Sequence, residues 1–67
     1  MTADLKQVLT EREVHTRYGL TVPWLRKRRR VGGGPNYLKL GRLIRYRVPD
    51  IDLFLAERIV PQDGAAQ

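Results

Sequence analysis

The chain has 67 residues, no cysteine and one histidine, and its 13 Lys and Arg residues against seven Asp and Glu give a formal net charge of +6. This length accommodates one domain with a small core and leaves little room for an enclosed active site. Without cysteine there are no disulfides or thiolate zinc sites, and a single histidine argues against a histidine-based metal cluster, so we expect no metal and no cofactor.

The charge is segregated along the chain. Between Val14 and Pro49 there are ten Lys and Arg residues and no Asp or Glu, whereas the two ends together carry a net charge of −4. Such segregation costs self-repulsion unless a polyanion relieves it, which favours a nucleic-acid partner. Ten of the 13 cations are arginine, whose planar fork suits phosphate groups and guanine edges. The alternative is a solvated basic face that serves solubility.

The first strong local signal is Thr10 followed by Glu13, which matches a capping box. Leu9 and Val14 occupy the matching positions of a hydrophobic staple, in which one apolar residue on each side of the cap packs against the other. Together these signals predict a helix over residues 11–18.

Thr21 is a second N-cap candidate, and Pro23 is tolerated in a first helical turn because the amides there have no partner within the helix. They predict a helix from Val22 to about Arg30, which Gly32 ends. Only a short connection beginning at Gly19 separates this helix from the first. Two short helices joined by a tight turn that contains glycine are typical of a helix-turn-helix.

Two segments with period-two alternation, residues 37–40 and 44–48, follow a flexible glycine-rich connector and predict a hairpin. A three-residue loop, 41–43, would pair Leu40 with Ile44. It would place Leu38, Leu40, Ile44 and Tyr46 inward and Tyr37, Lys39, Arg45 and Arg47 outward. A two-residue loop would pair Lys39 with Ile44 and mix the faces. Because a slip of one residue moves every side chain to the other face, we predict the three-residue loop, with Arg42 at the tip.

Pro49 and Asp50 suit the start of a last helix, since proline fits its first turn and an acid favours the positive end of its dipole. We predict that Pro61 ends this helix. Its predicted core stripe is Ile51, Phe54, Leu55 and Ile59. The predicted domain covers residues 1–60, with weak signals over 1–8, and residues 61–67 are predicted to be a disordered tail.

The order of elements predicts an α+β fold, mostly α, with the architecture of a winged helix-turn-helix. The second helix would enter the major groove of DNA, which is about 12 Å wide. Its predicted contacts are Pro23, Trp24, Arg26 and Lys27 at base edges and Thr21, Arg28, Arg29 and Arg30 at phosphates. The predicted contacts of the wing are Arg42 at the tip and Lys39, Arg45 and Arg47 behind it. For Trp24, packing against the first helix is an equal alternative.

The stretch from TEREV to PDIDLFL resembles the small excisionase-family DNA-binding proteins, also called recombination directionality factors, which have a MerR-type winged-helix architecture. The resemblance covers about residues 9–57 and is most specific at Gly34–Arg42 and at Ile44-Arg45-Tyr46. By resemblance, Lys27 reads the major groove and Arg42 enters the minor groove. One departure is Arg28, which stands where the family often has an aromatic residue on the core side of the helix.

We do not expect an enzyme, because the sequence shows no set of nucleophile, base and orienting residue and no metal cluster. The resemblance implies a protein that binds and bends attachment-site DNA to promote excision by an integrase. The expected partners are double-stranded DNA, an integrase and further copies of the chain on DNA, with Leu53 as a candidate neighbour contact. The expected location is the cytoplasm, on the nucleoid, in a protein encoded by a bacterium or phage. Two alternatives stay open: a small phage or plasmid transcriptional regulator with the same fold, and an RNA-binding protein.

Overall fold

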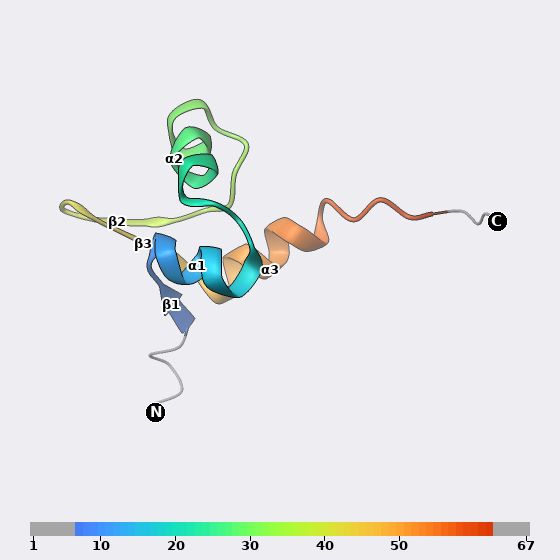
Figure 1. Cartoon of the computed structure of the whole chain (residues 1–67), viewed down its shortest axis with the longest axis horizontal. Helices are drawn as coiled ribbons and strands as arrows, with labels where there is room; N and C mark the ends of the chain where they lie inside the picture. Colours follow the sequence, from blue (N-terminus) through green and yellow to red (C-terminus); the bar gives the residue numbers. More distant parts are fainter. Residues whose placement is uncertain (1–6, 63–67) are drawn as a thin grey trace.

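The computed structural model describes residues 7–62, which form three helices and a three-stranded antiparallel sheet (Figure 1). In chain order the elements are β1 (Val8–Leu9), α1 (Glu11–Tyr18), α2 (Val22–Val31), β2 (Leu38–Leu40), β3 (Leu43–Arg47) and α3 (Val48–Ala56). The strand order is β1-β3-β2, so β3 is the central strand. These elements confirm the α+β class. Within the described residues, no helix has both the length and the apolar character needed to cross a membrane.

The predicted start of α1 is confirmed in detail. The Thr10 hydroxyl oxygen accepts a hydrogen bond from the Glu13 amide at 3.1 Å, and the Glu13 carboxylate accepts one from the Thr10 amide at 2.9 Å. The staple residues Leu9 and Val14 are both buried. Gly19 follows the helix with φ of 80°, in the left-handed region that favours glycine.

The second helix is also close to its prediction. The Thr21 hydroxyl caps α2 by accepting a hydrogen bond from the Trp24 amide at 3.3 Å. The helix ends at Val31, one residue later than predicted. Gly32 follows it with φ of 91°, at the position predicted to end the helix. The connection from α1 to α2 is therefore the three residues 19–21.

The hairpin register is one residue away from the predicted one. The pairs are Leu38 with Arg45, Lys39 with Ile44 and Leu40 with Leu43. The loop therefore contains two residues, Gly41 and Arg42, instead of the predicted three. Gly41 has φ of 63°, and a two-residue hairpin loop with glycine at its first position gives the strands their natural twist.

The prediction of the register was wrong because it assumed that the whole hairpin has a buried face. Figure 1 shows the yellow end of the hairpin extending beyond α1 and α2. A strand is held to one register by its faces only where one face is buried. Tyr46 is buried as predicted, but Leu40, predicted to point inward, is 57% exposed. Arg42 lies in the loop, as expected.

The last helix ends at Ala56, well before Pro61. Just beyond this end, the Arg58 guanidinium lies 3.8 Å from the centroid of the Phe54 ring and donates a hydrogen bond to the Phe54 carbonyl oxygen at 3.2 Å. A cation that satisfies a terminal carbonyl stabilises the end of a helix. Of the predicted stripe, Ile51 and Phe54 are buried, whereas the leucine at position 55 is 37% exposed and the isoleucine at position 59 is 70% exposed. The second half of that prediction was wrong.

One cluster of buried side chains joins β1, β3 and the three helices: Leu9, Val14, Leu25, Tyr46 and Ile51. Leu9 belongs to β1 and pairs with Tyr46 of the central strand. The sequence did not predict β1, because a strand of two residues shows no periodicity. Of the predicted tail, Pro61 and Gln62 have no regular secondary structure, and residues 63–67 lie outside the described residues.

The capping box gives a first prediction. Replacement of Thr10 by Ala removes the side-chain acceptor for the Glu13 amide, so the free energy of unfolding should fall by about 1 kcal/mol. Urea unfolding followed by circular dichroism measures the change. Thr16→Ala is the matched control, because Thr16 is exposed on the same helix. Equal effects of the two substitutions would contradict the role of the cap.

Candidate nucleic-acid interface

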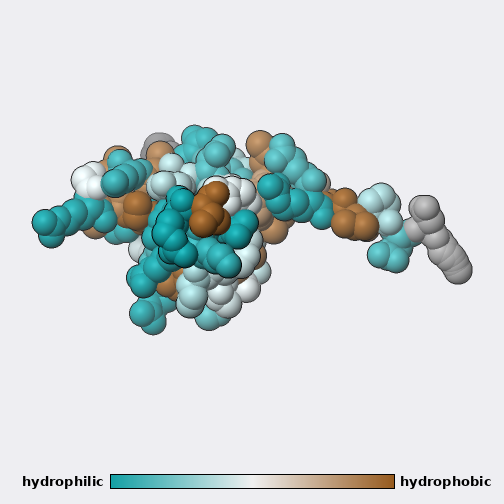
Figure 2. All heavy atoms as spheres, turned by 90° about the horizontal axis from the view of Figure 1, so that it is seen from above, coloured by the Kyte–Doolittle hydropathy of each residue, from teal (hydrophilic) through white to brown (hydrophobic). Residues whose placement is uncertain are grey.

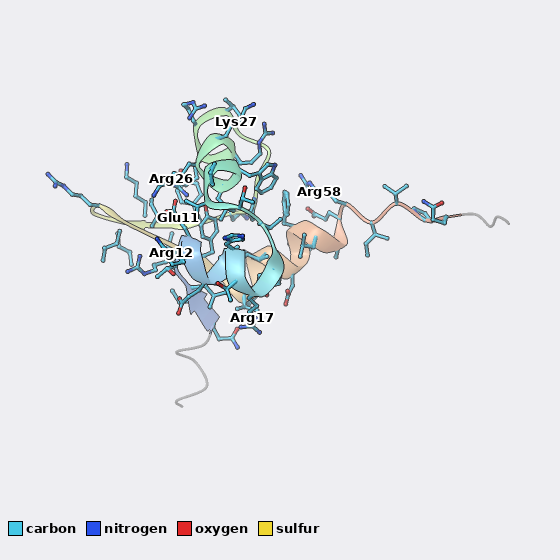
Figure 3. All side chains as sticks on the ribbon, viewed as in Figure 1. Glu11, Arg12, Arg17, Arg26, Lys27 and Arg58 are labelled. Atoms are coloured by element: carbon cyan, nitrogen blue, oxygen red, sulfur yellow. The ribbon has the colours of Figure 1, made fainter. Side chains whose placement is uncertain are left out.

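One face of α2 is turned away from the core. Its residues are Pro23, Arg26, Lys27 and Arg30, which are all exposed and lie at helical spacings of three or four. We call these four residues the outer face of α2. Figure 3 shows Lys27 on the side of α2 that points away from α1. A helix with such a cationic outer face can approach a polyanion without moving its core side chains.

The opposite side of α2 packs into the molecule. Leu25 is fully buried, and Trp24 is half-buried with its ring edge-on to Phe54 of α3, at 5.9 Å between centroids and 63° between planes. Trp24 is therefore a half-buried packing residue, as the predicted alternative had it, and its aromatic partner is Phe54 of α3. The tryptophan thus packs α2 against α3. An aromatic pair of this kind stabilises the fold by more than the burial of its apolar area alone.

Arg29 also belongs to the inner side of α2. Its guanidinium forms an ion pair with the Glu11 carboxylate at 2.7 Å and donates a hydrogen bond to the Tyr46 hydroxyl oxygen at 2.8 Å. Tyr46 is buried, and this burial raises the pKa of its phenol. The network links α1, α2 and β3. We therefore leave Arg29 out of the proposed binding surface, although the sequence suggested a phosphate contact for it.

Glu11 holds a second arginine as well. Its carboxylate accepts three hydrogen bonds from Arg26, at 3.1–3.3 Å, and Figure 3 shows the two residues side by side between α1 and α2. The Arg26 side chain stays 63% exposed, whereas that of Glu11 is only 18% exposed. The hydrogen bonds from Arg26, helped by Arg29, hold the pKa of Glu11 below its ordinary value despite its partial burial. Glu11 thus holds the guanidinium of Arg26, while most of the Arg26 side chain remains exposed to solvent.

Arg28 occupies the core-side position at which the resemblance leads one to expect an aromatic residue. The stem of this side chain lies under the glycine segment that follows α2. A Cβ atom added to Gly34 would lie 2.6 Å from the Arg28 Cβ, and one added to Gly33 would lie 3.2 Å from an Arg28 Nη atom. Its Nε is buried and has no hydrogen-bond partner in the described structure. The close approach requires glycine at position 34, and the segment is packed on α2 rather than being a free connector.

Of the four predicted cations of the hairpin, two are exposed near its end and two make hydrogen bonds within the protein. Lys39 and Arg42 are exposed. Arg45 is half-buried and donates a hydrogen bond to the Ile44 carbonyl oxygen at 2.8 Å. Arg47 makes two hydrogen bonds to the Asp50 carboxylate, at 2.8 and 2.9 Å, which hold the pKa of that carboxyl below its ordinary value. Arg47 is exposed too but is paired with Asp50, so the exposed hairpin cations that have no carboxylate partner among the described residues lie toward the end of the hairpin.

An open groove of about 520 Å³ lies between the start of α1, α2 and the hairpin. Five arginines line it: Arg12, Arg26, Arg29, Arg42 and Arg45. Glu11 is also among its lining residues and neutralises part of this charge. Arg12, Arg26 and Arg42 are the exposed arginines, and exposed guanidinium groups beside an open groove suit phosphate groups, which accept two parallel hydrogen bonds from one arginine. The groove brings cations of α2 and of the hairpin to one surface.

The predicted site residues thus fall into two groups. Those that are exposed are Thr21, Pro23, Arg26, Lys27, Arg30, Lys39, Arg42 and Arg47, and those drawn inward are Trp24, Arg28, Arg29 and Arg45. Sequence analysis missed the part played by Glu11. An acidic residue in the first turn of a helix is already favoured by the helix dipole, so its charge needed no other partner. Nothing along the chain pointed to partners 15 and 18 residues away. The pairing of Arg47 with Asp50 was readable from their spacing of three.

No protein-family model matches the chain, and no curated protein matches it. The function proposed below therefore rests on the residues of this chain and on their geometry.

The network around Arg29 predicts a difference between two neighbouring cations. Arg29→Met leaves Glu11 without one ion-pair partner and the Tyr46 hydroxyl without its donor, so the free energy of unfolding should fall by about 2 kcal/mol. Lys27→Met is the matched control and should change it by less than about 0.5 kcal/mol, because Lys27 is exposed. Urea unfolding at neutral pH measures both. A stable Arg29 variant would contradict the internal role.

A third prediction concerns acid. Because the pKa of Glu11 is lowered in the folded protein, folding favours the ionised form. Its contribution to stability is present above the ordinary carboxyl pKa and is lost as pH falls through the lowered one. Glu11→Gln should therefore be less stable than the wild type at neutral pH, and the gap should close in acid, where Glu11 is also neutral. Urea unfolding over a pH series measures the gap. Glu57→Gln, at an exposed position, is the control, and a gap that persists in acid would refute the prediction.

Proposed function

We propose that the protein is a sequence-specific architectural DNA-binding protein with the architecture of a winged helix-turn-helix. In this proposal α2 is the recognition helix and the β2–β3 hairpin is the wing. The observation that carries the proposal is the arginine-lined groove, because residues of α2 and of the hairpin border the same groove. One duplex could then contact both elements at once.

The outer face of α2 supports insertion into the major groove. The groove is about 12 Å wide and admits one helix, and its base edges distinguish all four base pairs. Pro23 and Arg26 lie in the first half of α2 and Lys27 follows directly, and the N-terminal residues of a recognition helix approach the bases. Arg30, one turn further on, would meet the backbone. The Lys27 side chain is the best placed to reach a base edge, because it is exposed and Glu11 holds the Arg26 guanidinium.

The hairpin supports a second contact beside the first. Lys39 and Arg42 are exposed toward its end, and Arg42 lies in the loop. In a winged-helix complex such a ribbon follows the backbone or enters the adjacent minor groove, where arginine is favoured if the groove is narrow. Phosphate contacts of this kind fix the orientation of the protein on the duplex.

The role in excision is the more specific part of the proposal and is supported by the resemblance of residues 9–57 to excisionases. A protein of this type binds and bends attachment-site DNA and so directs an integrase toward excision. A small transcriptional regulator with the same surface is the alternative, and the neighbourhood of the gene separates the two. An adjacent integrase gene with attachment repeats supports excision. Duplex RNA is disfavoured as a ligand, because its deep, narrow major groove does not admit a helix.

DNA binding is tested with the duplex that the wild type enriches from a random pool. The logarithm of its affinity should fall with the logarithm of salt concentration by roughly 0.9 per phosphate contact. Lys27→Ala should weaken binding about tenfold, as expected for loss of one base contact. Fluorescence anisotropy measures both effects.

Arg17→Ala is the matched control, because Figure 3 shows Arg17 on the side of the molecule away from Lys27. It should bind nearly as the wild type does. Affinity that is insensitive to salt, or equal losses in the two variants, would count against the proposed surface, and equal competition by duplex RNA would favour an RNA ligand.

A further inference from the structure

The end of the hairpin carries two exposed leucines. Leu40 and Leu43 are directly opposite each other in the ladder and flank the two-residue loop. They are 57% and 53% exposed. We call residues 40–43 the hairpin tip. Side chains of directly opposed residues project from the same face of a hairpin, so the two leucines form one apolar pair.

This pair has no part in the core. Successive side chains of a strand alternate between faces, so Leu43 projects from the face opposite to Ile44. It is Ile44 and Tyr46 that pack with the core cluster, whereas neither leucine belongs to it. Figure 2 shows hydrophobic atoms directly behind the hydrophilic outer end of the hairpin. The exposed pair is thus an apolar surface outside the core cluster, with Leu43 bordering the arginine-lined groove.

The charge around the pair limits what can cover it. Arg42 lies between the leucines in the chain and Lys39 precedes them, while the nearest acidic residue along the chain is Asp50. Glu11 lines the same groove as Leu43, but its carboxylate is paired with Arg26 and Arg29. A partner must therefore combine negative charge with apolar surface at the scale of one hairpin tip. The minor groove of a DNA duplex has both features, since its walls are deoxyribose and its rims are phosphates. A second copy of the basic hairpin would repel this one.

We propose that Leu40 and Leu43 enter the minor groove as an apolar wedge and that the wedge bends the DNA. This inference rests on the proposed function and assigns the bending to named side chains. The strands of a ribbon are about 4.8 Å apart before side chains are counted, and the minor groove is about 6 Å wide. A tip with two leucines is wider than the groove, so its entry must widen the groove. Apolar side chains inserted in this way partly unstack a base step and kink the duplex.

The test compares the bend produced by the wild type with that produced by the double variant Leu40→Thr/Leu43→Thr. Threonine keeps the strand propensity while it removes most of the apolar surface. The probe is the enriched duplex, about 30 base pairs long, with a donor dye at one end and an acceptor at the other. At protein concentrations that saturate the duplex, the double variant should lose at least half of the change in energy transfer. Its affinity should fall about tenfold.

Two controls separate an apolar wedge from other contacts. Ile59→Thr replaces an aliphatic residue that is 70% exposed and lies beyond the end of α3, and it should bend DNA as the wild type does. Arg42→Ala should lower the salt slope by about 0.9, whereas the leucine variant should leave the slope unchanged. Circular dichroism should show a thermal midpoint near that of the wild type for the double variant. If the double variant unfolds, the single variant Leu40→Thr takes its place, with a smaller but measurable loss of bending.

The outcomes distinguish this inference from the function on which it rests. Full bending by a folded leucine variant overturns the wedge and leaves DNA binding intact. Failure of the wild type to bind any duplex overturns the proposed function, and the wedge with it. Self-association of the wild type without DNA that the double variant abolishes would show in sedimentation velocity. It would make the tip a contact between copies and overturn the wedge.

Discussion

The fold depends on one carboxylate. Glu11 lies in the first turn of α1 and binds two guanidinium groups of α2, one of which also binds the buried Tyr46 of β3. Partly buried charge of this kind is costly unless it is fully paired, and removal of one partner leaves the others uncompensated. The carboxylate also lies at the positive end of the α1 dipole. Its ionised form is therefore stabilised both by the two arginines and by the helix dipole. The network therefore sets the position of α2 against α1 and the sheet, and with it the direction in which the outer face of α2 points.

This network also decides how the basic residues are used. The middle of the chain has ten cations and no acid, but several of these cations are engaged by carboxylates from the ends of the chain. Arg29 is committed to the interior and Arg47 to Asp50. Carboxylates from the acidic ends of the chain thus help to define the basic surface, because the cations that they bind are less available to a polyanion. The charge offered to a polyanion is smaller than composition suggests, and on α2 and the hairpin it comes mainly from Lys27, Arg30, Lys39 and Arg42.

Local signals predicted local structure well. The caps of α1 and α2 depend on residues three positions apart, so Thr10 and Thr21 identified both helix starts. Such local signals could not predict the strand pairing or the network of side chains around Glu11. The hairpin register depended on how far the hairpin extends past the core, and the partners of Glu11 are set by the packing of α1 on α2. For α3, the periodic stripe continued past the true end, because periodicity takes no account of a cation such as Arg58 that satisfies the last carbonyls.

The packing of Gly34 on Arg28 has a consequence for how this sequence can vary. The predicted clash of any larger residue at position 34 is with a Cβ atom, so shortening Arg28 to alanine would not relieve it. Only a second glycine, placed in the last turn of α2, would make room, and glycine inside a helix costs about 1 kcal/mol. The two positions are therefore coupled in substitution, although only one of them carries a functional group. A segment whose composition is typical of a flexible linker is in this chain one of the least replaceable parts of the backbone.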